Sequence, residues 1–322
     1  MDIYTSTVDY LSKLPVLNEW TETWSVLKRI TSMQPRDWQL PFLACRAVGG
    51  VDEQAIPAVS ALACAQVGII LIDDMLDEDP RGEYHRVGEG QAANIAAAFL
   101  SAGIQAILQS AVQPKARLEA LRSLNQMVLA TAFGQYLDSQ NPSNESDYWR
   151  VVENKSAPFY GAAMRLGAVF GNASGEMAEL VERIGRIYGE IIQIHDDLND
   201  TLAVPANPDW LQGRSPLPIL FAKSVDHPER SRFLELLQEV SDENALREAQ
   251  EILIRCGAVS YCVDQLLRRY QSARDVLAAG SLPRRDVLDA LLEEVVAPVW
   301  RLFEAIGEAP VTFIPKELES AG

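Results

Sequence analysis

Apolar residues recur three and four positions apart along almost the whole chain, which is the spacing of one face of an α-helix. Glycine and proline interrupt this pattern at intervals, and no run of alternating apolar and polar residues suggests a strand. The pattern predicts helices near residues 4–13, 16–32, 38–48, 56–78, 90–112, 115–138, 145–170, 175–201, 216–225, 228–239, 243–256, 258–279 and 284–306.

The predicted fold is all-α, with a single large helical domain over residues 1–322. The chain has 322 residues, of which 48% are apolar, and this is enough to bury one large core. It contains no long linker and no low-complexity tract. Pro310 and Pro315 interrupt the end of the chain, so we expect residues 307–322 to form a loosely held tail.

The formal net charge of −17 excludes some classes of partner. An acidic protein repels nucleic acid and anionic membrane surfaces, so neither is expected to bind. The N-terminus lacks the basic and apolar segments of a signal peptide, and the fully apolar stretches are short. We therefore expect no transmembrane segment and a cytoplasmic location. The cysteines form no CxxC pair, which favours buried apolar thiols in a reducing compartment.

Two acidic DDxxD motifs each follow a strongly apolar helical segment. The first contains Asp73, Asp74 and Asp77, and the second contains Asp196, Asp197 and Asp200. Within each motif the first and last aspartates are four residues apart and share one helix face. Carboxylates gathered at a helix C-terminus repel one another and oppose the helix dipole, unless a cation offsets them. Mg²⁺ typically combines one or two carboxylates with substrate phosphates, so the paired motifs predict a magnesium site for a phosphorylated substrate. The alternative is that each motif is a solvated acidic face.

With these motifs the chain resembles the trans-polyprenyl diphosphate synthase family, which includes the farnesyl and geranylgeranyl diphosphate synthases. Further segments carry the resemblance, namely Pro41–Gly50, Arg81-Gly82, Gly134-Gln135 with Asp138, Lys155-Ser156 and Gly213–Pro218. The resemblance implies the class I isoprenoid synthase fold, a single large helical bundle around a central apolar cavity. It also implies a homodimer.

The resemblance further implies that an allylic prenyl diphosphate is ionised with three Mg²⁺ ions per active site, for which Mn²⁺ can substitute. The implied metal ligands are Asp73, Asp74, Asp77, Asp196 and Asp200, with Asp197 supporting them. The implied substrate-binding residues are Arg81, Lys155, Gln193, Arg214, Gln66 and Gln135. The bulky residues that limit product length in the family lie one turn before the first motif. Gly68 occupies that turn here, which suggests a pocket for a long prenyl chain.

One segment departs from the family pattern. The family's site for isopentenyl diphosphate, the second substrate, begins with Gly-Lys-Arg-x-Arg-Pro, whereas this chain has Arg36-Asp37-Trp38-Gln39-Leu40-Pro41. An acid in place of a cation removes attraction for a phosphate and adds repulsion.

Three functions therefore remain open. The first is chain elongation with a re-formed site for isopentenyl diphosphate. The second is ionisation without that co-substrate, either to cyclise the prenyl chain or to transfer it to another acceptor. The third is a non-catalytic partner subunit of a prenyl synthase, against which the complete acidic motifs argue.

Overall fold

The computed structural model describes residues 1–305, and this part of the chain is α-helical without a strand. The all-α prediction is therefore confirmed, while the predicted tail at 307–322 lies outside the described residues. The elements are α1 (Ile3–Leu11), α2 (Pro15–Glu19), α3 (Thr21–Ser32), the 3₁₀ helix η1 (Arg36–Trp38), α4 (Gln39–Ala47), α5 (Asp52–Leu76), α6 (Tyr84–Val87), α7 (Glu89–Leu108), α8 (Pro114–Asp138), α9 (Glu145–Asn154), α10 (Ser156–Phe170), α11 (Gly175–Leu202), α12 (Pro208–Leu211), α13 (Leu217–Ser224), α14 (Arg230–Leu236), α15 (Glu243–Arg255), α16 (Ala258–Ala279) and α17 (Arg285–Ala305).

Two helices that the periodicity predicts as continuous are each divided in the structure. The segment 16–32 is split at Trp20, whose backbone is extended (φ −93°, ψ 98°). The segment 145–170 is split at Lys155, between α9 and α10. Pro158 explains the second break, because proline has no N–H to donate to the carbonyl four residues earlier and would disrupt a continuous helix. At the start of α10 the same proline is tolerated.

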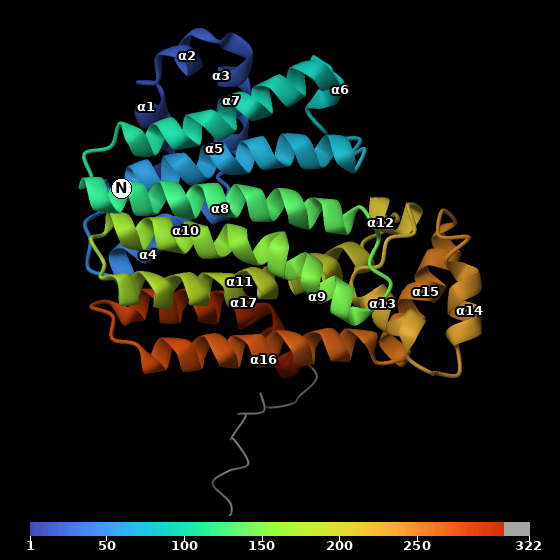
Figure 1. The fold of residues 1–322 in the computed structure, drawn as a ribbon. Coiled ribbons are helices and arrows are strands. Elements are labelled where there is room, and N and C mark those ends of the chain that lie inside the picture. The colour runs from blue at the N-terminus through green and yellow to red at the C-terminus, as the bar shows by residue number, and fades with distance from the viewer. Residues whose placement is uncertain (306–322) are drawn as a thin grey trace, which may run out of the picture.

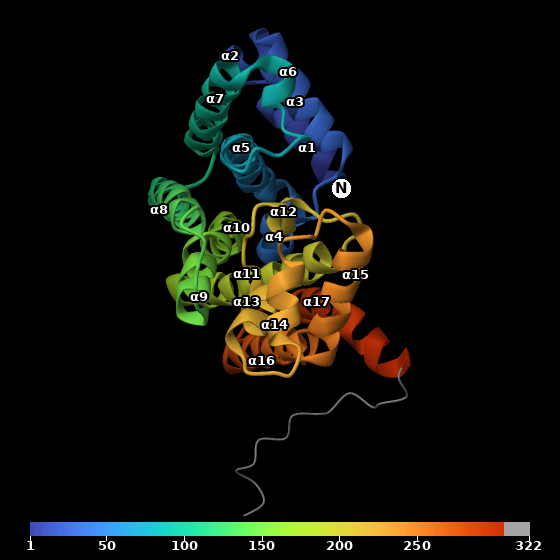
Figure 2. The same cartoon turned by 90° about the vertical axis from the view of Figure 1, so that its right-hand side faces the viewer.

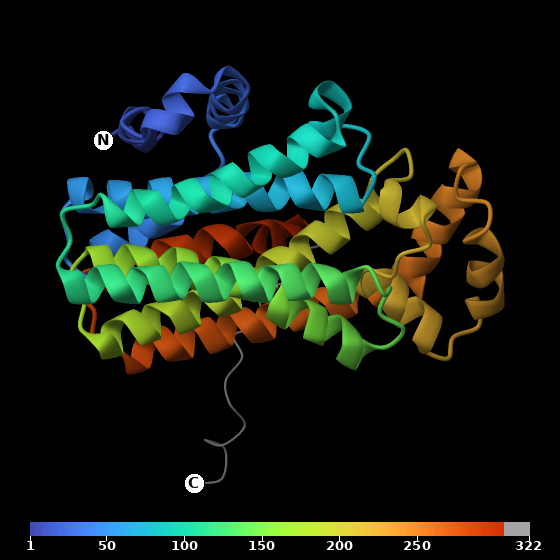
Figure 3. The ribbon, with the colours of Figure 1, turned by 45° about the horizontal axis from the view of Figure 1, so that its top comes forward.

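The long helices run side by side as a bundle (Figures 1 and 3). The helix α10 is almost entirely buried and packs against α4, α8 and α11. Its small residues allow close approach of the neighbouring backbones. A Cβ atom at Gly167 would lie 2.0 Å from the carbonyl oxygen of Pro41, so α4 crosses α10 at backbone contact. This packing fixes the position of the segment that precedes Pro41.

A smaller helical cluster closes the end of the bundle at which α5 and α11 finish (Figures 1 and 2). It comprises α12, α13, α14 and α15 and has an apolar core of its own, which includes Trp210, Ile219, Phe233, Leu246 and Leu253. The cluster therefore lies at the same end of the bundle as both acidic motifs, below the end of α5 in Figure 2.

Two helices, α5 and α7, are long and apolar enough to cross a membrane by length and composition alone. This differs from the expectation based on the short fully apolar stretches. In α5, 72% of the most apolar window is buried inside the bundle, which is typical of a core helix. The corresponding share in α7 is 44%, so α7 keeps an uncharged face that the described residues 1–305 leave uncovered.

Candidate active site

The two acidic motifs face each other across one cavity. Asp73 and Asp74 occupy the last turn of α5, and Asp77 caps its C-terminus. The second motif lies in the last two turns of α11. The cavity has a volume of about 330 Å³ and is termed the acidic cavity below. Its charged lining residues are Asp73, Asp77, Asp138, Asp196, Asp197, Asp200, Asp209, Lys155 and Arg214. The structure thus brings together two motifs that are far apart in the sequence.

Two largely buried cations are paired with acids of this cavity. The Nζ atom of Lys155 lies 2.7 Å from Oδ2 of Asp138 and 3.5 Å from Oδ1 of Asp73. Burial alone would lower the pKa of Lys155, but Asp138 and Asp73 outweigh it and raise that pKa above its usual value. Lys155 therefore stays charged, and the helix break at this residue places its side chain in the cavity.

Arg214 is the second of these cations. Its Nη2 atom donates to Oδ1 of Asp77 at 2.6 Å, and Gln135 donates to the same oxygen at 3.3 Å. Only 23% of the Arg214 side chain is exposed, as for Lys155. Each cation is thus already neutralised by an aspartate of the cavity, and an anionic ligand would have to exchange with that partner.

The carboxylates are held close enough together to resist ionisation. Burial under the surrounding protein raises the pKa of Asp196 to about 7, and the charges of Asp197, Asp200 and Asp37 add to this effect. Burial and then Asp79 and Asp73 raise the pKa of Asp74 to about 6. Burial also raises the pKa of Asp73. A bound cation would relieve this repulsion and favour the ionised forms.

The donor set fits a hard cation that is shared with a ligand. The Oδ1 atom of Asp73 is buried and accepts no hydrogen bond, and the Nζ atom of Lys155 lies 3.5 Å from it, so this oxygen could coordinate an ion once Lys155 turns aside. Among residues 1–305, no three His, Cys, Asp or Glu side chains converge closely enough to hold an ion by themselves. Phosphate oxygens and water would have to complete each coordination shell, as Mg²⁺ prefers.

Asp197 differs from its neighbours because both of its carboxylate oxygens are satisfied. Oδ1 accepts a hydrogen bond from Gln193 at 2.8 Å, and Oδ2 accepts one from the backbone N–H of Leu217 at 2.8 Å. Gln193 in turn accepts a hydrogen bond from the Ser156 hydroxyl. Asp197 therefore fixes the start of α13, which directly follows the loop that carries Arg214.

Four residues implied by the resemblance, namely Asp74, Gln135, Arg81 and Gln66, are not among the residues that line the acidic cavity. Arg81 is 86% exposed in its side chain and pairs with Asp79 at 2.8 Å. Gln66 donates to Oδ2 of Asp37 at 2.7 Å and accepts from the indole N–H of Trp38 at 2.7 Å. Gln66 thus holds the segment that departs from the family pattern.

The structure also adds residues that the sequence did not single out as site residues. Asp138, Asn141, Tyr148, Asp209 and Ser215 all line the acidic cavity. Asp138 is the last residue of the segment that resembles GQxxD, so this motif could have identified it as a site residue. Asp209 and Asn141 lie in or beside loops, where no periodicity marks a side chain as facing a cavity.

A second cavity of about 340 Å³ lies on the other side of α11, between α11, α17 and the η1–α4 segment. It is lined by Arg36, Asp37, Gln39, Leu40, Leu43, Tyr188, Ile192, His195, Asn199, Leu291, Glu294, Val295 and Pro298. The Oε1 atom of Glu294 lies 3.1 Å from the guanidinium of Arg36. The Nε2 atom of His195 lies 2.8 Å from the carbonyl oxygen of Val295.

Gly68 faces α7. A Cβ atom at this position would lie 2.9 Å from Cγ of Leu100 and 3.0 Å from the carbonyl oxygen of Ala96. The glycine therefore permits close packing of α5 on α7. A large side chain at Gly68 would separate these helices, so the substitution is a poor probe of product length.

Comparison with known proteins agrees with this geometry. The sequence model of the polyprenyl synthetase family matches residues 39–253. The chain belongs to the polyprenyl synthetase family. It is 28% identical to the short chain isoprenyl diphosphate synthase of Methanothermobacter thermautotrophicus over 268 residues, which are 78% of this chain and 81% of the relative. It is 26% identical to the geranylgeranyl diphosphate synthase of Methanosarcina mazei, over 73% of this chain and 76% of that protein. This polyprenyl synthetase is accordingly an enzyme of the prenyltransferase class.

Solved structures show the same fold at low sequence identity. The decaprenyl diphosphate synthase from Rhodobacter capsulatus superposes with a TM-score of 0.79 at 18% identity, covering 92% of this chain and 95% of that chain. The polyprenyl synthase from Caulobacter crescentus, which was solved with calcium and isoprenyl diphosphate, gives 0.71 at 20% identity, covering 90% and 97%. The all-helical isoprenoid synthase fold implied by the resemblance is thereby confirmed.

Proposed function

We propose that this polyprenyl synthetase is a Mg²⁺-dependent prenyltransferase that ionises an allylic prenyl diphosphate in the acidic cavity. The observation that supports this most directly is the meeting of both DDxxD motifs with Lys155 and Arg214 around one cavity. Carboxylates alone would repel a diphosphate, and cations alone would not require two acidic motifs. Together they suit a diphosphate that arrives with its metal ions.

When bound, Mg²⁺ would neutralise the charge that develops on the diphosphate as its bond to the prenyl carbon breaks. Asp73, Asp77, Asp196 and Asp200 would hold the ions from opposite sides of the cavity. Lys155 would turn from Asp138, and Arg214 from Asp77, toward the phosphate oxygens. Their present ion pairs hold both side chains at the cavity, and each would exchange its aspartate partner for a phosphate oxygen there.

The relatives support prenyl transfer as the reaction class. The curated relatives compared above are prenyl diphosphate synthases, and the Caulobacter structure carries a divalent metal together with a prenyl diphosphate. These names favour neither a cyclase nor a non-catalytic subunit. Mg²⁺ as the physiological metal, the number of ions and a cytoplasmic location remain predictions.

The proposal is tested by release of inorganic diphosphate from farnesyl or geranylgeranyl diphosphate with Mg²⁺. Asp73→Ala and Asp196→Ala should each lower the rate by about 10²–10³-fold or more, because each removes a group that stabilises charge in the transition state. Circular dichroism should show unchanged helicity. Full turnover by either variant would overturn the metal assignment.

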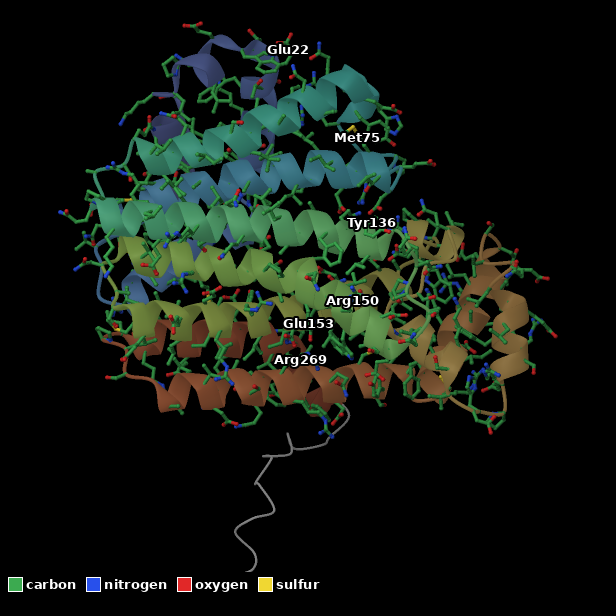
Figure 4. The ribbon with its side chains drawn as sticks, in the orientation of Figure 1. Glu22, Met75, Tyr136, Arg150, Glu153 and Arg269 are labelled. Carbon is green, nitrogen blue, oxygen red and sulfur yellow. The ribbon has the colours of Figure 1, made fainter. Side chains whose placement is uncertain are left out.

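We also propose that the chain forms a homodimer through the adjoining outer faces of α7 and α8. Residues 90–108 and 123–137 contain no charged side chain, although the net charge of the chain is −17. Exposed apolar residues lie on these faces, including Leu108, Leu118, Leu129, Phe133 and Tyr136 (Figure 4 labels Tyr136). An apolar surface of this kind is typical of a protein interface.

Sedimentation equilibrium tests the proposed dimer. Leu129→Lys should shift the mass toward the monomer, whereas Ile254→Lys, at an equally exposed apolar position on α15, should not. A monomeric wild-type protein would contradict the proposal.

A further inference from the structure

The second cavity has the wrong charge for a second diphosphate. Its acids are Asp37 and Glu294, and Arg36 is the single lysine or arginine among the lining residues that the structure describes. The Arg36 guanidinium is already paired with Glu294, and both side chains are mostly exposed. Among residues 1–305, no free cation lines this cavity to offset the Asp37 carboxylate that a diphosphate placed here would meet.

Asp37 is held in place by its surroundings. Gln66 donates to its Oδ2 atom at 2.7 Å, and the same Gln66 accepts from the indole of Trp38, which is fully buried. The Tyr160 side chain also lies near Asp37. A shift of this segment that brought Arg36 into the place of Asp37 would break these contacts. The contacts of Asp37 therefore fix its carboxylate in the lining of the cavity.

The second cavity adjoins the acidic cavity across α11. Residues Tyr188, Ile192, His195 and Asn199 form one stripe of α11 and line the second cavity. Gln193, Asp196 and Asp200 form the neighbouring stripe and line the acidic cavity. The Tyr160 ring packs at a tilt of 58° against the Tyr188 ring, with centroids 5.6 Å apart, and Tyr160 lies near both Asp37 and Asp196. A molecule in the second cavity is thus a neighbour of the site where the prenyl diphosphate ionises.

The remaining lining suits a small amphipathic molecule. Leu40, Leu43, Ile192, Leu291 and Val295 supply apolar surface. The carboxylates of Asp37 and Glu294 are acceptors only, whereas Gln39, Tyr188 and Asn199 can each donate as well as accept. The volume of about 340 Å³ is typical of a pocket for a small molecule. Acceptors of this kind select a ligand that brings hydrogen-bond donors, such as an alcohol or an amine.

We propose that the second cavity binds the prenyl acceptor, and that this acceptor is an alcohol or amine without phosphate groups. The inference rests on the proposed function, since it names the second substrate of the same reaction. The bond between the prenyl carbon and the diphosphate oxygen breaks, and the diphosphate leaves with the electron pair. A lone pair of the acceptor oxygen or nitrogen forms the new bond to that carbon. The proton that the acceptor loses passes to the Asp37 carboxylate.

The first experiment compares acceptors for the wild-type protein with Mg²⁺ and geranylgeranyl diphosphate. Release of inorganic diphosphate is followed alongside mass spectrometry of the products. The probes are isopentenyl diphosphate, 3-methyl-3-buten-1-ol, which has its carbon skeleton without the phosphates, and benzylamine. The inference expects a prenyl ether or prenyl amine with a neutral or cationic probe, and no elongated diphosphate.

The second experiment changes the charge at Asp37. Asp37→Lys should raise kcat/KM for isopentenyl diphosphate by at least about tenfold, because it replaces a repelling charge by an attracting one. Asp37→Asn keeps the shape and should slow the transfer to the alcohol or amine probe by about 10²-fold through loss of the proton acceptor. Glu22→Lys is the matched control, since it makes the same charge change on α3 (Figure 4 labels Glu22) at a residue that lines neither cavity.

The outcomes separate this inference from the proposed function. If the wild-type protein releases no diphosphate under any condition, the proposed function fails and the inference with it. If diphosphate is released and isopentenyl diphosphate is incorporated efficiently, only the inference is overturned. A hydrocarbon formed without any added acceptor also overturns it. Should Asp37→Lys fail to fold, Asp37→Asn and the acceptor comparison still decide.

Discussion

The two cavities that flank α11 are similar in volume but differ in the side chains that pair with their carboxylates. In the acidic cavity, Lys155 and Arg214 are largely buried and face the carboxylates. In the second cavity, Asp37 accepts a hydrogen bond from the neutral side chain of Gln66, and Arg36 forms an ion pair with Glu294 at the surface. The first arrangement suits an anion that brings metal ions, whereas the second suits a ligand that brings hydrogen-bond donors.

The two cavities also differ in their relation to the family. All the lining residues of the acidic cavity lie within the matched residues 39–253, whereas Arg36, Asp37 and Glu294 of the second cavity lie outside them. Membership of the polyprenyl synthetase family therefore bears most directly on the cavity proposed to bind the prenyl diphosphate. The acceptor has to be inferred from the residues of this chain.

The largest expected effect comes from removing a cation of the acidic cavity. Lys155→Met should lower kcat for diphosphate release by about 10²–10³-fold, because the charge that stabilises the leaving diphosphate is lost. Arg150→Met is a matched control from the same region, since Arg150 lies on the outer side of α9 (Figure 4) and lines neither cavity. Equal losses in the two variants would show that the position of the cation in the cavity does not matter.

A smaller effect is expected on stability, with a defined dependence on pH. The pKa values of Asp74, Asp196 and Asp197 in the fold are about 6, 7 and 6, against 3.8 as the ordinary value. A carboxyl whose pKa is raised by folding binds its proton more tightly in the folded state. Its stabilising contribution is complete below about pH 4 and is lost as the pH rises through 6 to 7. Without metal, the melting temperature should therefore fall between about pH 4 and pH 7.

Differential scanning fluorimetry measures this slope with and without Mg²⁺ and inorganic diphosphate. Because cations bind the ionised carboxylates, the ligands should raise the melting temperature more at pH 8 than at pH 5. Asp196→Asn should flatten the slope of the metal-free protein. A slope that is unchanged in this variant would contradict the assignment of the raised pKa to Asp196.

Much of the acidic cavity was predictable from local spacing. The aspartates of each motif share a helix face, and an apolar helix leads into each motif, so the pattern alone suggested a shared metal site. Lys155 was predicted only through the resemblance, because periodicity showed one continuous helix through this position. The break that places its side chain in the cavity arises from Pro158, whose effect depends on the helix register.

The second cavity was predictable only in part. The sequence showed an acid at position 37 where a cation was expected, but it left open whether the segment could shift and bring Arg36 into place. In the structure Arg36 pairs instead with Glu294, which comes from α17, far along the chain. Likewise, the contact of Gln66 with Asp37 joins α5 to η1. Pairings of this kind depend on tertiary packing. The periodicity of a single sequence predicts helices but not which distant side chains meet.

The smallest expected effect distinguishes a supporting role of Gln66 from direct action on the substrate. Gln66→Leu leaves both the Asp37 carboxylate and the Trp38 indole without their shared partner. The free energy of unfolding should therefore fall by about 1–3 kcal/mol, as measured by urea denaturation. Release of diphosphate should change only a few-fold, because Gln66 does not line the acidic cavity. A loss of kcat as large as that of Lys155→Met, without a loss of stability, would instead place Gln66 on the substrate and merge the two cavities into one functional site.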